Sequence, residues 1–202
     1  MIAGLLQAPP GAIDLASNTL ALGAQYILTS ADHLLFLFAL LLLVRRRRAL
    51  AWSVIAFTVA HSMTLAAATL GMVRVPAPPV AASIALSIAF LASELVLEAQ
   101  GRPGLVARWP GSVAFAFGLL HGLGFADALG KADLPPHAIP IALPCFNVGI
   151  ELGQLAFLFA ALCLLAGLRW LPLPRIGAWR TASAYAMGGV AMCWTLQRAV
   201  QF

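Results

Sequence analysis

Long apolar runs, separated by short polar or basic segments, dominate this chain of 202 residues. Each run is close to the roughly 20 residues that a helix needs to cross the hydrocarbon core of a bilayer. The runs cover residues 20–44, 50–71, 79–98, 109–130, 141–167 and 181–200. They lack the alternation of polar and apolar residues that is typical of transmembrane barrels. The pattern therefore predicts one all-α domain over residues 1–202, a polytopic bundle of about six transmembrane helices.

The first run carries two adjacent hydroxyl residues, Thr29 and Ser30, in its interior. This segment is compatible with one continuous helix or with a break between a half-helix and a full helix. Upstream of the run, Pro9 and Pro10 interrupt regular structure. We expect residues 14–18 to lie at the membrane interface.

Composition agrees with a membrane protein. Hydrophobic residues make up 62% of the chain and charged residues 9%, whereas soluble domains carry about 25% charged residues. The net charge of +5 comes from residues between the runs, so it does not indicate nucleic-acid binding; the expected surroundings are lipid. Cys145, Cys163 and Cys193 are far apart in the chain and indicate neither a disulfide framework nor a thiolate metal site.

The basic residues divide unequally between the two sides of the predicted bundle. Nine of the 12 fall in the first, third and fifth loops, at residues 45–48, Arg102, Arg108, Arg169, Arg175 and Arg180. The other side holds Arg74, Lys131 and Arg198. Cytoplasmic loops carry the excess of Lys and Arg. We therefore predict a multi-pass protein of the cell (inner) membrane, with both termini facing away from the cytoplasm.

Five ionisable residues lie deep inside the runs. They are Asp32, His33, His61, His121 and Glu151. Each imidazole or carboxylate falls about 10 to 13 residues into its run, within about two helical turns of the midplane. A charged residue at this depth costs about 2.5–3.5 kcal/mol on insertion scales and faces the bundle interior, a cavity or an ion. A buried Asp–His hydrogen bond between helices is the structural alternative, but four runs contributing to one level favour a shared polar site.

Several further residues have both a functional and a structural interpretation. Tyr26, Thr58, Asn147 and Gln154 are candidates for a second shell, and Thr58 for a bond to the His61 ring. Asn147 and Gln154 suit interhelical hydrogen bonds equally well. We interpret Gly118 and Gly122 as helix-packing residues. We expect Ser87 to bond to backbone, Glu94 and Glu98 to reach water at the cytoplasmic end, and His137 to lie on the surface.

Imidazole and carboxylate groups form a donor set suited to Zn(II), Ni(II), Co(II) or Mn(II). The negative charge of Asp32 and Glu151 would offset a divalent cation in a medium of low dielectric constant. Without a metal, the same groups suit a proton relay. The residues alone leave these two interpretations open.

Five blocks of this sequence resemble the HupE/UreJ family of small membrane proteins. They lie at residues 28–36, 57–65, 84–88, 117–126 and 146–154, and include Ala-Asp-His at 31–33, Val-Ala-His-Ser at 59–62, Leu-Leu-His-Gly at 119–122 and Asn-Val-Gly-Ile-Glu at 147–151. The resemblance implies a nickel or cobalt permease, or an accessory of hydrogenase and urease maturation. It marks Asp32, His33, His61, His121 and Glu151 as motif positions. The chain departs from the family at Tyr26, where a histidine is frequent, and near Ala81, where a glutamate is common.

Three functions follow as hypotheses. The first is a transporter that passes a divalent transition metal ion through a mid-membrane site, with nickel as the first candidate and cobalt or zinc as the others. The second is an intramembrane zinc hydrolase in which Glu151 or Asp32 acts as general base. The third is a metal-free accessory subunit. Metal binding and transmembrane flux separate the three.

Overall fold

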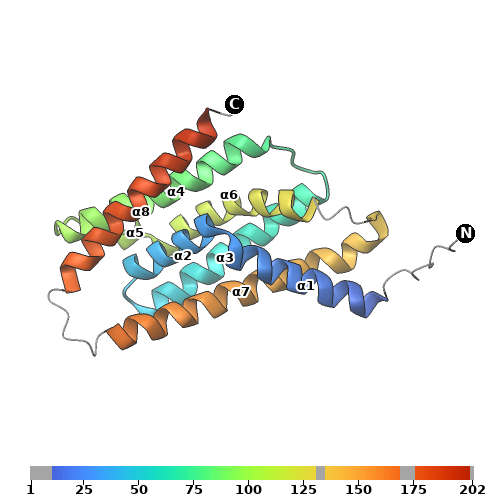
Figure 1. The fold of residues 1–202 in the computed structure, drawn as a ribbon, viewed down its shortest axis with the longest axis horizontal. Coiled ribbons are helices and arrows are strands. Elements are labelled where there is room, and N and C mark those ends of the chain that lie inside the picture. Colours follow the sequence, from blue (N-terminus) through green and yellow to red (C-terminus); the bar gives the residue numbers. More distant parts are fainter. Residues whose placement is uncertain (1–10, 131–134, 169–175, 201–202) are drawn as a thin grey trace, which may run out of the picture.

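The computed structural model describes residues 11–130, 135–168 and 176–200, and these ranges contain helices and no strand. The elements are α1 (Ala12–Thr29), α2 (Ala31–Leu43), α3 (Arg47–Thr69), α4 (Ala77–Ala99), α5 (Leu105–Arg108), α6 (Pro110–Gly130), the short 3-10 helix η1 (Pro136–Ala138), α7 (Ile139–Leu168) and α8 (Ile176–Ala199) (Figure 1). The predicted all-α class is confirmed. Residues 14–18 belong to α1, so the first helix begins before the apolar run that starts at residue 20.

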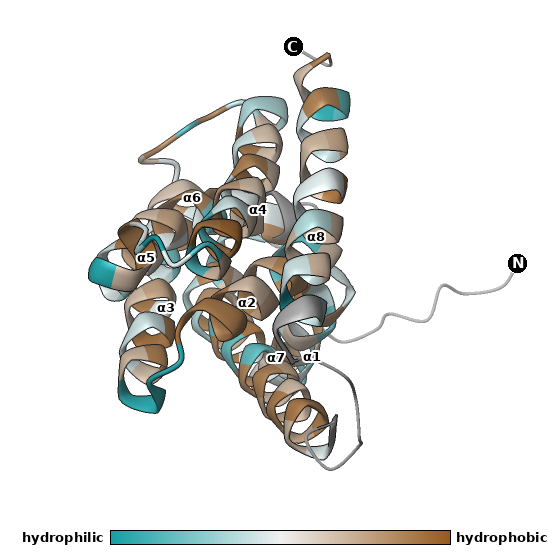
Figure 2. Ribbon diagram, turned by 90° about the vertical axis from the view of Figure 1, so that its left-hand side faces the viewer, coloured by the Kyte–Doolittle hydropathy of each residue, from teal (hydrophilic) through white to brown (hydrophobic). Residues whose placement is uncertain are grey.

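Several described helices have the length and hydropathy of membrane spans. Long enough and apolar enough to cross a membrane are helix α3, helix α4 and the segment Pro136–Gly167. Helices α1 and α2 reach this length and hydropathy together, as one bent pair. Helix α6 contributes a shorter apolar stretch, Pro110–Ala126. The hydropathy colouring in Figure 2 shows helix bodies that are mostly hydrophobic, with hydrophilic residues in the connection after α2. The membrane character is therefore supported, while the count of six spans and their orientation stay predictions.

The first predicted run is broken at Ser30, where the backbone is extended, and α1 and α2 meet there at an angle of 69°. Hydroxyl groups bond to the carbonyls at the end of α1: Ser30 Oγ donates to the Tyr26 carbonyl at 2.7 Å, and Thr29 Oγ1 to the Gln25 carbonyl at 2.9 Å. Such bonds satisfy backbone groups that the break leaves without a helical partner. The break places Asp32 and His33 in the first turn of α2.

Glycines allow the helices to pack closely in pairs. A Cβ atom on Gly23 or Gly149 would collide with the backbone of the neighbouring helix in the α1–α7 pair, and one on Gly118 or Gly122 would do so in the α3–α6 pair. The packing interpretation of Gly118 and Gly122 is confirmed. Helix α8 lies along α4, and α2, with eight buried residues, lies between these pairs.

One end of the bundle gathers basic residues around acids. Glu98 forms ion pairs of 2.9 Å with both Arg45 and Arg180. Glu94 is buried and accepts a hydrogen bond of 2.7 Å from the backbone N–H of Val106, in the first turn of α5. The expectation that Glu94 reaches water is wrong, because the connection that carries α5 folds back over α4. Glu98 keeps 24% of its side chain exposed, in agreement with its predicted access to water. Gly104 leaves the room that the Glu94 carboxylate fills.

Glu94 therefore stabilises the fold. Removing its carboxylate by Glu94→Ala leaves a buried N–H without a partner, which costs about 1–3 kcal/mol. We expect the thermal unfolding midpoint of the purified protein to fall by a few degrees. Glu94→Gln keeps an acceptor oxygen and should lose clearly less. Equal losses in the two variants would contradict this assignment.

Candidate functional site

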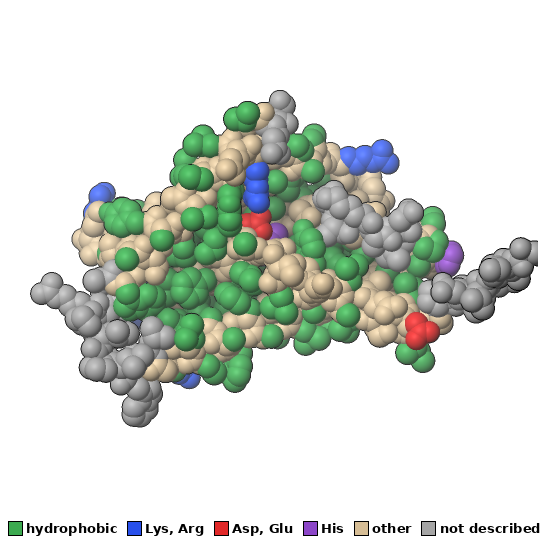
Figure 3. Space-filling model, viewed as in Figure 1, with side chains coloured by type: hydrophobic (Ala, Val, Ile, Leu, Met, Phe, Trp, Pro, Cys, Tyr) green, Lys and Arg blue, Asp and Glu red, His purple; other side chains and the backbone are tan. Residues whose placement is uncertain are grey.

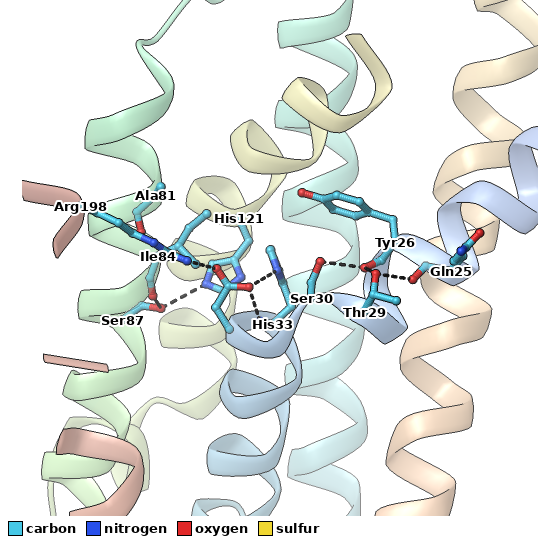
Figure 4. Close-up of polar contacts among 11 residues, drawn as sticks. Gln25, Tyr26, Thr29, Ser30, His33, Ala81, Ile84, Ser87, His121 and Arg198 are labelled. Carbon is cyan, nitrogen blue, oxygen red and sulfur yellow. Dashed lines mark hydrogen bonds and ion pairs between the residues drawn. The ribbon is translucent and has the colours of Figure 1, made fainter. Parts of the chain in front are cut away.

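A chain of polar contacts links three helices in the interior of the bundle (Figure 4). Asp32 Oδ1 accepts hydrogen bonds of 3.1 Å from the backbone N–H and from Nδ1 of His33. The Nε2 atom of His121 on α6 lies 3.1 Å from the Oγ atom of Ser87 on α4. The rings of His33 and His121 meet edge to face, with 4.8 Å between their centroids. Two of the three predicted imidazoles are thus in contact. Asp32, His33, Ser87 and His121 form the first polar group.

The hydrogen bonds assign the tautomer of each ring. Ser87 Oγ donates its single hydrogen bond to the Ile84 carbonyl at 2.7 Å, so it accepts a hydrogen bond from the Nε2–H group of His121. The Asp32 carboxylate can only accept, so His33 donates from Nδ1. The remaining nitrogens, His33 Nε2 and His121 Nδ1, are buried and have no hydrogen-bond partner in the described residues. In its neutral form, each ring therefore has one lone pair without a hydrogen-bond partner among the described residues. Ser87, expected to bond to backbone, also bonds to His121.

His61, Ser62 and Asn147 form a second polar group. Phe57 and Phe125 contact both His61 and the first polar group. The ring centroid of Phe125 is 4.5 Å from that of His33 and 5.2 Å from that of His61. Phe57 stands in the same way between His61 and His121, at 5.4 and 5.2 Å. His61 is fully buried, and neither of its ring nitrogens has a partner in the described part of the chain.

Of the predicted second-shell residues, Asn147 contacts the helix that carries His61. Asn147 donates from Nδ2 to Ser62 Oγ at 2.8 Å, which is the interhelical bond considered above. Gln154 is buried with both amide atoms unpaired among the described residues. The predicted bond from Thr58 to the His61 ring is not formed.

The other predicted residues have separate positions. Tyr26 lies beside the first group, with its ring centroid 6.4 Å from that of His33. Glu151 is half-buried on α7 and forms no hydrogen bond or ion pair within the described ranges. His137 is exposed, as expected. Among the described residues, no three His, Cys, Asp or Glu side chains are placed to hold one ion together, so the five-residue metal set stays a prediction.

Sequence reasoning missed Arg198. Its Nη2 lies 3.1 Å from Asp32 Oδ2, and its Nη1 donates to the Ala81 carbonyl at 2.8 Å. Arg198 was expected on the outer surface because it is close to the end of the last apolar run. Arg198 nevertheless lies within that run, where a charged residue needs a partner. Its position in the run could therefore have indicated an ion pair inside the bundle.

A cavity of about 710 Å³ reaches the first group from the connection between α3 and α4. Its lining includes Tyr26, Asp32, His33, Arg74 and Arg198. In the space-filling view, acidic and histidine atoms lie together beneath a basic side chain near the middle of the face (Figure 3). Water or an ion can therefore reach the Asp32–His33 pair without crossing the packed core.

Comparison with known protein families shows to which family this chain belongs. The family model described as HupE / UreJ protein matches residues 5–198, nearly the whole chain. The chain belongs to the HupE/UreJ family. The resemblance inferred from the five blocks is confirmed. No curated protein and no solved structure matches this HupE/UreJ protein significantly.

The family blocks coincide with the polar interior of this HupE/UreJ protein. The first block contributes Asp32 and His33 at the helix break, and the fourth contributes His121. The second and fifth blocks contribute His61 and Asn147 to the second group. Residues far apart in the chain thus form two neighbouring polar groups between the helix pairs.

Proposed function

We propose that this HupE/UreJ protein transports a divalent transition metal ion, with nickel as the first candidate and cobalt or zinc as the others. The observation that carries the proposal is the pair of ring nitrogens, unpartnered among the described residues, on His33, which lines the cavity, and on His121, whose ring contacts that of His33. Neutral imidazole nitrogen is a ligand for all three metals. Membership of the HupE/UreJ family supports the same function.

The surroundings of His33 suit a metal ligand. A histidine that binds a metal usually donates its other ring N–H to a carboxylate, which fixes the ring and raises its basicity. Asp32 makes this contact with His33 Nδ1. The helix break adds a second argument, because discontinuous helices near the midplane form the binding sites of many transporters. The ion would be the cargo of this site.

His61 offers a second step for the ion. The rings of Phe57 and Phe125 contact both His61 and the histidines of the first group. Several weak sites in series favour transport, since an ion that binds too tightly at one site does not leave. A path from the cavity past Phe125 to His61 would use the buried Asn147 and Gln154 oxygens as further weak ligands.

Flux measurements in liposomes test the proposal. We expect purified protein, reconstituted into liposomes that contain a metal-sensitive dye, to give saturable uptake of Ni²⁺ that Mg²⁺ does not inhibit. Liposomes without protein and liposomes with His137→Ala, which changes an exposed histidine, serve as controls. Tight metal binding without flux would contradict transport and favour the hydrolase hypothesis. Neither binding nor flux would favour the metal-free accessory subunit.

A further inference from the structure

Arg198 approaches the site from the last helix, contacts Oδ2 of Asp32 and lines the same cavity as Asp32. We propose that its guanidinium is a built-in cation that pairs with Asp32 while no metal is bound, and that an incoming metal ion must displace it. This proposal rests on the proposed function, because it assigns a role to one more residue of the same site. Arg198 would then set how weakly the first group holds its ion.

Both oxygens of the Asp32 carboxylate are engaged. Oδ1 accepts from His33, and Oδ2 contacts Arg198 at 3.1 Å. A metal ion that approaches from the cavity can reach this carboxylate only through Oδ2. The ion and the guanidinium carry charge of the same sign, and their repulsion is strong at contact distance in a poorly solvated site. Binding of the ion and the Arg198–Asp32 pair therefore exclude each other.

The arginine has two contacts that do not depend on Asp32. Its Nη1 bonds to the Ala81 carbonyl, and its guanidinium carbon lies 5.8 Å from the centroid of the Trp194 ring. Neither contact involves Asp32, so both remain available when the ion pair opens. The side chain is 27% exposed and lines the cavity, which leaves it room to move.

This arrangement also explains how a carboxylate is tolerated at this depth. An unpaired charge in the apolar interior is costly, and a site that releases its ion would leave Asp32 without a counter-charge. Arg198 restores the pair at that moment and so favours release. The exchange of one cation for another keeps the carboxylate paired throughout.

The test compares two arginines that line the same cavity. Arg198→Gln removes the charge at Asp32, whereas Arg74→Gln removes the charge of an exposed arginine that forms no ion pair among the described residues. Affinity for Ni²⁺ is measured by titration calorimetry on purified protein in lipid nanodiscs. We expect Arg198→Gln to bind Ni²⁺ at least about tenfold more tightly. Arg74→Gln should stay within about twofold of the wild-type protein, because water and salt screen an exposed charge.

Two further variants complete the test. Arg198→Met keeps apolar packing against Trp194 without the charge, and should tighten binding as Arg198→Gln does if the latter does not fold. In the Asp32→Asn background, Arg198→Gln should change the affinity by less than about twofold, because the carboxylate that the arginine blocks is gone. Unchanged or weaker binding in both charge-removing variants would overturn the role of Arg198. If the wild-type protein and every variant fail to bind Ni²⁺, the proposed function itself fails.

Discussion

Replacing His33 by alanine is expected to lower Ni²⁺ affinity and uptake at least about tenfold. The substitution removes one of the two ring nitrogens that lack a hydrogen-bond partner among the described residues, and the partner that orients Asp32. Loss of residues that merely orient a metal ligand typically costs 10–100-fold, so loss of a ligand should cost no less. Calorimetry in nanodiscs and liposome flux measure the two quantities.

The matched control is His137→Ala, which removes an exposed imidazole in η1 and should change neither quantity. Gel filtration verifies that the His33→Ala variant remains a folded, monodisperse protein. Wild-type uptake by folded His33→Ala would show that the first polar group is not on the path of the ion. An equal loss in His137→Ala would point to non-specific binding by histidine.

Placing valine at Gly122 is expected to prevent α3 and α6 from packing together. A Cβ at this position would run into the His61 carbonyl and the Thr64 hydroxyl of α3. Overpacking of a tight contact costs about 1–3 kcal/mol, and membrane helices depend on such close contact because lipid supplies no hydrophobic drive for their association. We expect a lower unfolding midpoint and a reduced yield of monodisperse protein.

Gly189→Val is the matched control for this substitution, because an added Cβ on this exposed glycine of α8 meets no other atom. It should unfold close to the wild-type temperature. Equal stability of the two valine variants would contradict the α3–α6 contact at Gly122. Because Gly122 follows His121 and its Cβ would press on His61, the destabilised variant should also bind Ni²⁺ more weakly.

The sequence predicts how deep in the membrane the polar residues lie, but it does not predict their direction around each helix. Counting residues along an apolar run gives the position of a side chain along the membrane normal, since each helical residue rises by 1.5 Å. It does not give the rotation of one helix against its neighbours. His33 and His121 meet, whereas Glu151, at a similar predicted depth, forms no polar contact in the described ranges.

Separation of the imidazoles also depends on packing. Phe57 and Phe125 lie one helical turn from a histidine on their own helices, a pattern common to many apolar helices. Only the arrangement of α2, α3 and α6 inserts these rings between His61 and the other two histidines. Glu94 likewise became a capping residue through the folding back of the connection after α4.

By itself, the sequence determined the membrane class, the all-α structure, the family and the buried histidines with Asp32, because hydropathy and residue type act locally along each helix. Tertiary structure alone decided which of these residues meet, how the two polar groups are separated, and that Arg198 pairs with Asp32. Those contacts depend on the rotation and crossing of helices that are far apart in the chain, and close packing at glycines selects them.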